Sequence, residues 1–455
     1  MPPTALILSN TFHPHGVVAS VRVTNWARLL PDIGWRCVSV ARWYGQTATP
    51  AMLAEAVDPS ARLWYLDGPD AGRPIDADAH AEPNKPETSA AASSAQRGGL
   101  SLAKAAVDRT VGRLIVPDAQ RVQWARFWPS VRRVIKAESP DVVITSGPTH
   151  SIHRLGLRVA ATGVPWIADF RDPYLLDARF RPKGLARGTW PWHVAFERAV
   201  YARASAVTHA IPVHARWARR RYRLSEDRCI TLTHPCPRDL ADEDLEPAVA
   251  GPSRRSVRVV GVIGEAEARS LALGVTRVSA MRGEAIELRL VGPQSFDLGT
   301  LRSVLGDRLI ATGVVSHDEA KRQIAGADAL VSYLSPERSR HIGVSSKLYE
   351  FLAARRPIIA INPTRPDQQL LRRLPDVPML FEPDDESMFW ALQLALDHRA
   401  RFEFEMSARA RALRERHSWE LHALCLERAL ERAIGARGPA SARTVAGRPT
   451  EGAGG

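Results

Sequence analysis

Residues 4–40 read TALILSNTFHPHGVVASVRVTNWARLLPDIGWRCVSV, and this stretch decides the fold class. It begins with the short apolar run Thr4–Ser9, which a loop of His, Pro and Gly residues follows. Apolar side chains then recur at helical spacing up to Gly34, and a second apolar run, Cys37–Val40, comes next. A strand, loop, helix and strand in this order form a parallel unit with a right-handed crossover. The sequence therefore predicts an α/β fold built on a parallel sheet.

The same alternation continues after an interruption. Residues 67–99 are rich in Ala, Ser, Pro, Gly and Asp and hold few large apolar side chains, so we expect a disordered insertion there. Strand-like runs then occupy Asp141–Thr145 and Val164–Ala168, and the helical segment Ser151–Ala161 lies between them. We therefore predict that residues 1–240 form one Rossmann-like domain.

A second set of alternating elements fills the C-terminal half. Residues 237–256 are polar, rich in Pro and Asp and without periodicity, and we expect a linker over 241–256. A second doubly wound Rossmann-like domain over 257–435 is predicted, with a last helix that crosses back and a disordered tail over 436–455. Its strand-like runs are Val257–Val262, Ile286–Val291, Leu309–Thr312, Ala329–Tyr333 and Pro357–Ile361.

Charge and cysteine content narrow the function classes. In 455 residues, 62 Lys and Arg against 49 Asp and Glu give a net charge of +13. A basic surface favours phosphorylated substrates, nucleic acid or an anionic membrane face, although an Arg- and Ala-rich composition also follows from a GC-rich genome. The four cysteines are scattered and no histidines cluster at ligand spacing, so neither a disulfide framework nor a metal site is predicted.

No apolar run approaches the roughly 18 residues that a membrane-spanning helix needs, and the N-terminus lacks a basic leader. We therefore expect a cytoplasmic protein. The basic run Arg216–Arg223 leaves open a peripheral position on the anionic inner face of a membrane, although on a helix such a run is more often a solvated face. The same run is the support for a nucleic-acid partner, which is the weaker interpretation and is not expected.

The segment Gly343–Ala353, GVSSKLYEFLA, carries the strongest chemical signal. Gly and two Ser residues precede a helix, so backbone N–H groups and hydroxyls can meet a phosphate, and Lys347 adds a positive charge. Glu350 shares a helical face with Lys347, so that the pair can meet phosphate and sugar hydroxyls together. An isolated motif of this kind is more often a Ser N-cap with a surface Lys and Glu pair. The strand predicted directly after the helix argues against that interpretation.

This segment resembles the donor-site signature of family-four glycosyltransferases with the GT-B fold, in the branch with a Ser-Lys-hydrophobic-aromatic-Glu form. The resemblance implies that Glu350 binds the ribose of a nucleotide donor and that Ser346 and Lys347 lie against its diphosphate. The familiar pattern has another glutamate eight residues earlier, where this chain has Ile342. The neighbouring His341 is a further candidate for sugar contact.

The resemblance extends along most of the chain. In the family's first unit a glycine loop contacts donor and acceptor, and Gly16 is the glycine that remains of it here. Arg22, at the start of the next helix, either reaches a phosphate or sits on a solvated face. The end of the first strand of the second domain places Gly264 at the donor diphosphate, with Arg269 as the nearest basic residue, although an exposed helical arginine is the alternative.

Two segments of the first domain, Asp141–His153 and Ala168–Pro173, are similar to consecutive active-site loops of this branch, and both follow strand ends. Asp169 and Asp172 would orient acceptor hydroxyls, and Arg171 would offset phosphate charge or pair with an aspartate. The imidazole of His153 would donate a hydrogen bond to donor or acceptor. The alternatives are an internal ion-pair network and a buried histidine with a satisfied ring.

These patterns predict a glycosyltransferase that moves a sugar from a nucleoside-diphosphate sugar to a carbohydrate or lipid-linked acceptor, as in cell-envelope polysaccharide synthesis. The resemblance implies retention at the anomeric carbon and no metal or other cofactor. Asp169 and Asp172 are too close in sequence to be the opposed carboxylates of a glycosidase, and no G-x-G-x-x-G follows a strand. The main alternative is a non-catalytic GT-B-like binding protein that has lost full donor recognition, as Ile342 suggests.

Overall fold

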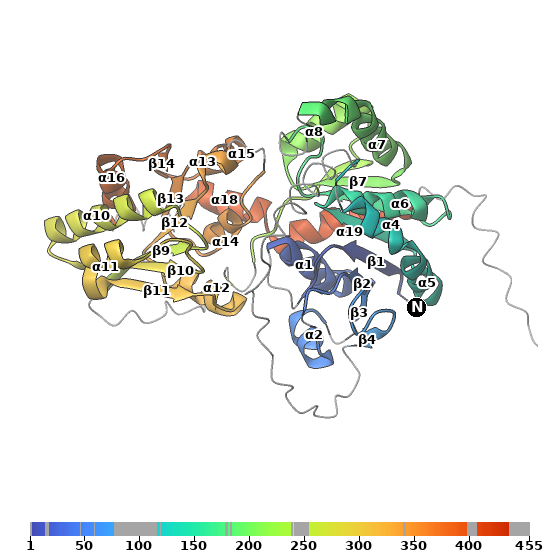
Figure 1. Ribbon diagram of the computed structural model, residues 1–455, viewed down its shortest axis with the longest axis horizontal. Helices are drawn as coiled ribbons and strands as arrows, with labels where there is room; N and C mark the ends of the chain where they lie inside the picture. Colours follow the sequence, from blue (N-terminus) through green and yellow to red (C-terminus); the bar gives the residue numbers. More distant parts are fainter. Residues whose placement is uncertain are drawn as a thin grey trace, which may run out of the picture. The chain divides into compact units, whose positions relative to one another are not determined.

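The computed structural model describes residues 2–13, 18–45, 47–58, 60–76, 116–118, 120–177, 181–182, 184–237, 240, 254–339, 343–397 and 407–435. The chain divides into two compact units, Met1–Leu232 with Ala423–Gly455, and Thr233–His422 (Figure 1). The first unit therefore ends at Leu232 rather than at residue 240, and it includes the last part of the C-terminal helix. Most of the predicted linker and the whole predicted tail lie outside the described residues.

The first unit is built on an eight-stranded sheet in the order β4-β3-β2-β1-β5-β6-β7-β8 (Figure 1). All neighbouring strands are parallel except β3 and β4. β1 and β5 are buried along their whole length, as expected of central strands covered by helices on both faces. The strands are β1 (Thr4–Ser9), β2 (Arg36–Ala41), β3 (Arg62–Tyr65), β4 (Pro74–Asp76), β5 (Val142–Gly147), β6 (Trp166–Phe170), β7 (Ala206–His209) and β8 (Cys229–Thr231).

Helices connect these strands by crossovers, as the sequence predicted. Gly156 allows α6 to lie directly on β6, because a Cβ there would come within 2.0 Å of a Trp166 ring atom. The helices are α1 (Val18–Asp32), α2 (Pro50–Ala56), α4 (Arg121–Arg126), α5 (Trp128–Glu138), α6 (His153–Ala160), α7 (Trp190–Arg203), α8 (Pro212–Tyr222) and α19 (Trp419–Gly435), with short 3-10 turns η1 (His150–Ile152) and η2 (Gly184–Thr189).

The predicted insertion is partly ordered, which corrects the expectation for residues 67–76. β4 pairs antiparallel with β3, so that its backbone groups have partners despite the polar composition. Asp67 is also held, because its two carboxylate oxygens accept from the Trp43 amide at 2.7 Å and the Arg42 guanidinium at 3.2 Å. The rest of the predicted insertion lies outside the described residues.

The second unit contains a six-stranded sheet in the order β11-β10-β9-β12-β13-β14, parallel throughout (Figure 1). One apolar cluster packs β9 and β10 against α10 and α16, and another packs β12 and β13 against α14. The strands are β9 (Arg254–Val260), β10 (Ala285–Val291), β11 (Leu309–Gly313), β12 (Ala329–Tyr333), β13 (Ile358–Ile361) and β14 (Met379–Leu380). The helices are α10 (Glu265–Arg282), α11 (Gly299–Leu305), α12 (His317–Ala325), α13 (Pro336–Ser339), α14 (Lys347–Ala353), α15 (Arg365–Leu371), α16 (Asp385–Ala395) and α18 (Ala408–Arg416), with the 3-10 turn η3 (Gly306–Arg308).

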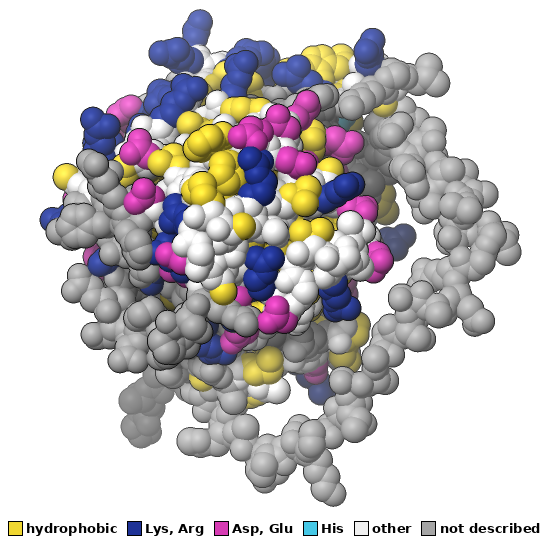
Figure 2. Space-filling model, turned by 90° about the vertical axis from the view of Figure 1, so that its left-hand side faces the viewer, with side chains coloured by type: hydrophobic (Ala, Val, Ile, Leu, Met, Phe, Trp, Pro, Cys, Tyr) yellow, Lys and Arg dark blue, Asp and Glu magenta, His cyan; other side chains and the backbone are white. Residues whose placement is uncertain are grey.

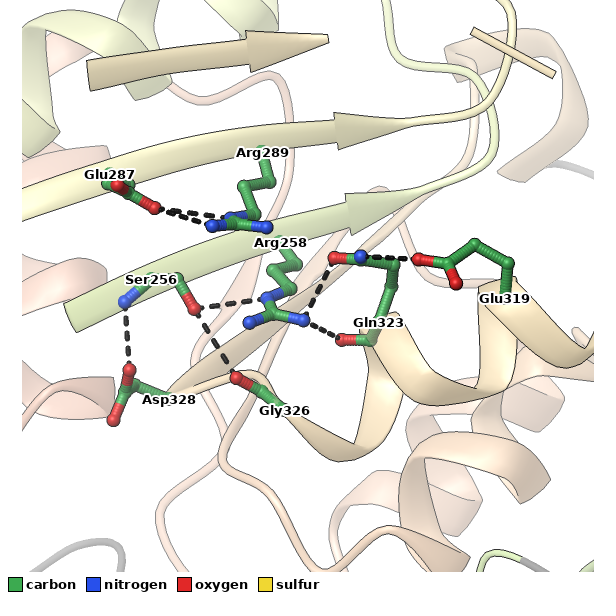
Figure 3. Close-up of polar contacts among 8 residues, drawn as sticks. All are labelled: Ser256, Arg258, Glu287, Arg289, Glu319, Gln323, Gly326 and Asp328. Atoms are coloured by element: carbon green, nitrogen blue, oxygen red, sulfur yellow. Dashed lines mark hydrogen bonds and ion pairs between the residues drawn. The ribbon is translucent and has the colours of Figure 1, made fainter. Parts of the chain in front are cut away.

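A polar network occupies the face of β9 that meets α12 (Figure 3). The buried guanidinium of Arg258 donates to the Ser256 hydroxyl at 3.0 Å and to the backbone and side-chain oxygens of Gln323 at 2.8 and 2.9 Å. Burial and the nearby charge of Arg289 lower the pKa of Arg258 to about 10. The network explains how a charged residue fits in the run VRVVGV without breaking the strand.

Candidate active site

Lys347 lies at the carboxyl edge of the second sheet. It is the first residue of α14, and its ammonium donates a hydrogen bond to the Val260 carbonyl at the end of β9, at 2.7 Å. Burial lowers the pKa of this ammonium, while the charge of Glu350 opposes the shift. Lys347 is therefore not the exposed partner of a surface Lys and Glu pair. Its side chain lies across the end of β9, where sheets of this kind bind ligands.

Glycines make room for this side chain. A Cβ on Gly261 would lie 1.9 Å from the Lys347 nitrogen, and Gly261 has φ of +106°. Gly292, after β10, approaches so closely that its Cβ would lie 3.2 Å from the Gly261 Cα. The Gln294 amide then bonds the carbonyls of Gly261 and Gly292 at 2.9 and 3.2 Å. Partly buried glycine backbone thus lies around the ammonium at this edge.

The turn before α14 is held from behind by the next helix. The carboxylate of Asp367 accepts from the Ser345 amide at 2.9 Å, and the Thr364 hydroxyl donates to the Gly343 carbonyl at 2.7 Å. One backbone N–H that the sequence offered to a phosphate is therefore already used inside the protein. Ser346 stands at the N-cap position of α14, but its hydroxyl makes no capping hydrogen bond, so the Ser N-cap interpretation is also not observed.

The other residues predicted to bind the donor differ in where the structure places them. Glu350 lies partly buried in the first turn of α14, close enough for its charge to act on Lys347. Gly264 is the N-cap of α10, and its amide bonds the Tyr333 hydroxyl. Arg269 is exposed in the second turn of α10, which agrees with the interpretation as an ordinary helical arginine. Gly16, His341 and Ile342 lie outside the described residues.

In the first unit, Asp169 lies at the centre of a buried ion pair. Its carboxylate accepts from Arg22 Nη2 at 2.9 Å and Nε at 3.1 Å, and from the hydroxyls of Ser146 and Thr208, both at 2.7 Å. Burial alone would raise the pKa of Asp169, but Arg22 and the two hydroxyls hold it below the ordinary value. Both oxygens are thus occupied and the side chain is fully buried. This geometry matches the internal ion-pair alternative and not direct contact with an acceptor.

Arg22 corrects both expectations for that residue. Its exposed fraction is 1%, so it lies neither on a solvated face nor at an open phosphate site. Besides Asp169, it donates to the Leu232 carbonyl at 2.7 Å, and its guanidinium stacks over Trp26. Arg22 thereby ties α1 to β6 and to the chain segment after β8.

Arg171 supports the loop after β5. Its guanidinium donates to the Gly147 carbonyl at 2.9 Å and to the Pro148 carbonyl at 2.7 Å, and burial lowers its pKa. Asp172 is half-buried beside it and opposes that shift. The two predicted loops are therefore brought together at one edge of the sheet, with Arg171 as the link between them.

His153 is fully buried beneath the same loop. Its Nδ1 lies 2.9 Å from the Thr145 hydroxyl, which also accepts from Trp166 Nε1 at 2.8 Å. Nε2 has no hydrogen-bond partner among the described residues, and a Cβ on Gly147 would lie 3.1 Å from it. Burial lowers the pKa of His153 to about 3, so the ring is neutral at physiological pH. Contact between His153 and a ligand requires the Gly147 loop to move, and the predicted role stays a prediction.

Solved structures with the same arrangement are numerous, whereas sequence comparisons find nothing. No protein-family model and no curated protein match the chain. Sucrose-phosphate synthase from Thermosynechococcus elongatus matches 95% of this chain and 100% of its own, with a TM-score of 0.59 and 13% identity. Anabaena HepE in complex with UDP and glucose matches 94% of this chain and 99% of its own, with a TM-score of 0.57 and 11% identity. The chain has the GT-B fold.

Other chemistry occurs on the same fold. A putative UDP-N-acetylglucosamine 2-epimerase from Listeria monocytogenes matches 96% of this chain and 98% of its own, with a TM-score of 0.57 and 11% identity. At such identities the likeness shows the fold alone. Among the described residues, no group of three or more His, Cys, Asp or Glu side chains is placed to hold a metal, and no helix is long and apolar enough to cross a membrane.

Sequence reasoning missed several residues of the second-unit edge. Four residues contact either Lys347 or the loop after β9, both of which the sequence indicated as donor-site features: Gly261, Gly292, Gln294 and Tyr333. A glycine directly after each strand was the available signal, because strand ends of a parallel GT-B sheet face the ligand side. Gln294 and Tyr333 carry no local pattern that marks them.

Proposed function

We propose that the chain is a glycosyltransferase that uses a nucleoside-diphosphate sugar as donor. The observation that supports it most is the ammonium of Lys347 at the carboxyl end of β9, above glycine backbone and one helical turn from Glu350. A diphosphate at this edge would meet Lys347 and bare backbone, and the ribose hydroxyls would meet Glu350.

Transfer would proceed with retention and without a metal. Charge that develops on the leaving diphosphate would be stabilised by Lys347 rather than by a bound cation. On the first unit, the Arg171-supported loop and Asp172 would position a carbohydrate or lipid-linked acceptor, with Asp169 acting as a positioning residue through Arg22 and Ser146. Synthesis of a cell-envelope polysaccharide at the cytoplasmic side of a membrane suits such an acceptor.

Donor binding is tested by thermal unfolding with UDP, GDP and uridine. We expect one diphosphate to raise the melting temperature, and Glu350→Ala to abolish the shift. Lys347→Met should weaken the diphosphate roughly 10- to 100-fold, since a charge-assisted contact is lost, and should change uridine binding little. Glu386→Ala, which removes an exposed partner of Arg277 in the same unit, is the control. The donor site is excluded if neither diphosphate stabilises the wild-type protein.

The products separate the remaining candidates. A transferase releases nucleoside diphosphate only when an acceptor is present, and the anomeric configuration read by NMR tests retention. Activity that survives EDTA supports the metal-independent mechanism. Conversion of a UDP-sugar to its epimer without an acceptor would favour the chemistry of the Listeria neighbour instead. Diphosphate binding without turnover of any nucleotide sugar would favour the non-catalytic binding protein.

A further inference from the structure

Two tryptophans project from the start of α7 in the first unit. Trp192 is 64% exposed and Trp190 is 37% exposed. The inner face of α7 is filled by other residues, among them Phe196, Val200 and Tyr201, so the tryptophans are not needed for the core. Trp190 and Trp192 stand two positions apart in the first turn of α7, and exposed apolar side chains rimmed by polar residues mark contact surfaces.

The surroundings of these tryptophans hold most of the net charge of the chain. Residues 178–225 contain eleven Lys or Arg and a single acidic residue, Glu197, which gives +10 of the total +13. Glu197 is buried, so it does not offset the charge at the surface. The exposed basic side chains of the described part are Arg181, Arg187, Arg198, Arg203, Arg216, Arg220, Arg221 and Arg223.

The two helices that carry these residues, α7 and α8, pack side by side (Figure 1). Tyr222, at the end of α8, stacks on Tyr201 and donates to Glu197 in the second half of α7. The two helices therefore run in the same direction, and the exposed Val213 at the start of α8 lies toward the tryptophan end. We call this the α7–α8 surface, defined by Arg187, Trp190, Trp192, Val213, Arg216 and Arg220.

The second unit offers a contrast. Trp390 on α16 is 61% exposed, nearly as much as Trp192. The face of that unit formed by α10, α11 and α16 mixes basic and acidic side chains (Figure 2); Arg277, for example, pairs with Glu386. Exposed aromatic surface therefore coincides with an excess of positive charge at α7–α8, even though Arg219 pairs there with Glu226, and not around Trp390.

We propose that the α7–α8 surface docks on a bilayer that contains anionic phospholipids. Tryptophan rings favour the boundary between headgroups and acyl chains, because they are apolar with one polar edge. Arginines around them would contact lipid phosphates, to which the negative surface potential attracts basic side chains. Neither contact alone binds firmly, but an apolar and an electrostatic anchor together do. The docking surface does not depend on which sugar donor the chain uses.

Docking in this way would orient the candidate acceptor loop. η2 and α7 follow directly after the loop that carries Arg171 and Asp172. The surface would hold that loop near the headgroups, where a lipid-linked acceptor presents its reacting end. This consequence rests on the proposed function, whereas the docking itself can fail or hold separately.

Sedimentation with vesicles tests the docking. We expect the full chain to bind vesicles of phosphatidylcholine with phosphatidylglycerol, to bind phosphatidylcholine alone weakly, and to be released by high salt. Trp190→Ser with Trp192→Ser should reduce the partition coefficient at least about tenfold, whereas Trp390→Ser should leave it unchanged. Quenching of tryptophan fluorescence by brominated lipid should disappear in the double variant and persist in Trp390→Ser.

Single charges give a graded second test. Arg187→Ala and Arg216→Ala should each weaken vesicle binding about fivefold, the effect expected of one basic side chain near an anionic surface. Arg302→Ala, at an exposed position of α11, is the matched control and should have little effect. Unchanged melting temperatures verify that these surface variants fold.

Three results would overturn the proposal. One is absence of vesicle binding at low salt, and another is equal loss from the Trp390 and the Trp190/Trp192 variants. The third is displacement of the vesicles by a single-stranded oligonucleotide whose own binding is lost in the Trp190/Trp192 variant. Stacking of bases on tryptophan would then explain the surface.

Discussion

Arg22 of the first unit and Arg258 of the second are both almost fully buried against a parallel sheet, with exposed fractions of 1% and 4%. Arg22 faces a carboxylate: both oxygens of Asp169 accept from it. Among the described residues, Arg258 donates only to neutral acceptors, the Ser256 hydroxyl and the two oxygens of Gln323. Accordingly, the pKa of Arg258 falls to about 10. The first sheet neutralises its buried arginine with a carboxylate, while the second surrounds its buried arginine with neutral hydrogen-bond acceptors.

The difference reflects what surrounds each group. Asp169 and Arg22 are enclosed by α1, β5, β6 and β7, and neither side chain has any exposed area. The Arg258 network instead continues outward, since Gln323 donates to Glu319, whose side chain is 31% exposed. A lone charge is therefore costly at the first site and tolerable at the second.

The largest effect is expected when the compensated pair is broken. Asp169→Ala leaves Arg22 buried without its anion and two hydroxyls without their acceptor, so the free energy of unfolding should fall by about 3–5 kcal/mol. Urea denaturation measures the loss, and hydrogen exchange of β5 and β6 amides assigns it to the first unit. Asp172→Ala, next to the same loop, should cost less than about 1 kcal/mol because that side chain is only half-buried.

A double variant separates charge from packing at this site. Arg22→Met with Asp169→Leu removes both charges together, so it should recover part of the stability lost in Asp169→Ala. A double variant less stable than the single one would mean that the ion pair itself, and not the avoidance of a lone charge, stabilises the unit.

Glu197 provides an intermediate case, a buried carboxylate that pairs directly with no arginine in the described part of the chain. Burial raises its pKa from 4.5 to about 7, although Tyr222 and the Leu175 amide donate to it. The native protein therefore binds a proton that the unfolded chain releases between these values. Stability should fall as the pH rises from 4.5 to about 7, by about 3 kcal/mol in total.

Glu197→Gln tests that linkage. The amide has no proton to lose, so the variant should gain stability over wild type at pH 8 and show a flatter pH profile in urea denaturation. The control is Glu427→Gln on α19, which should leave the profile as it is. Identical slopes for Glu197→Gln and wild type would place the titration elsewhere.

The sequence predicted the fold well because its signals are local. Apolar runs marked β1, β9, β10 and β12, and glycine and proline breaks marked the loops between them. Shorter strands such as β7 and β14 went unrecognised, since their few residues are held by parallel neighbours rather than by their own pattern. The ordered start of the insertion was missed for the same reason: β4 depends on pairing with β3.

The site was only partly predictable, because its contacts are long-range. Arg22 and Asp169 stand 147 positions apart, and nothing near either residue indicates an ion pair. Lys347 was recognised from its motif, yet its acceptor is the Val260 carbonyl, 87 positions away. Residue type and loop position indicated which edges of the sheets matter, but which groups remain open to a ligand depended on partners that only the folded chain brings together.

The smallest change is expected at the second arginine. Arg258→Met removes the charge and keeps most of the side-chain volume, so no ion is left unpaired, while Gln323 and Ser256 lose a donor at a site that water partly reaches. The free energy of unfolding should change by at most about 1 kcal/mol. Urea denaturation of Arg258→Met beside Arg22→Met, which strands the Asp169 carboxylate, measures the contrast directly. A loss at Arg258 as large as at Arg22 would show that neutral dipoles stabilise a buried guanidinium as strongly as a carboxylate does, and the distinction between the two sheets would not hold.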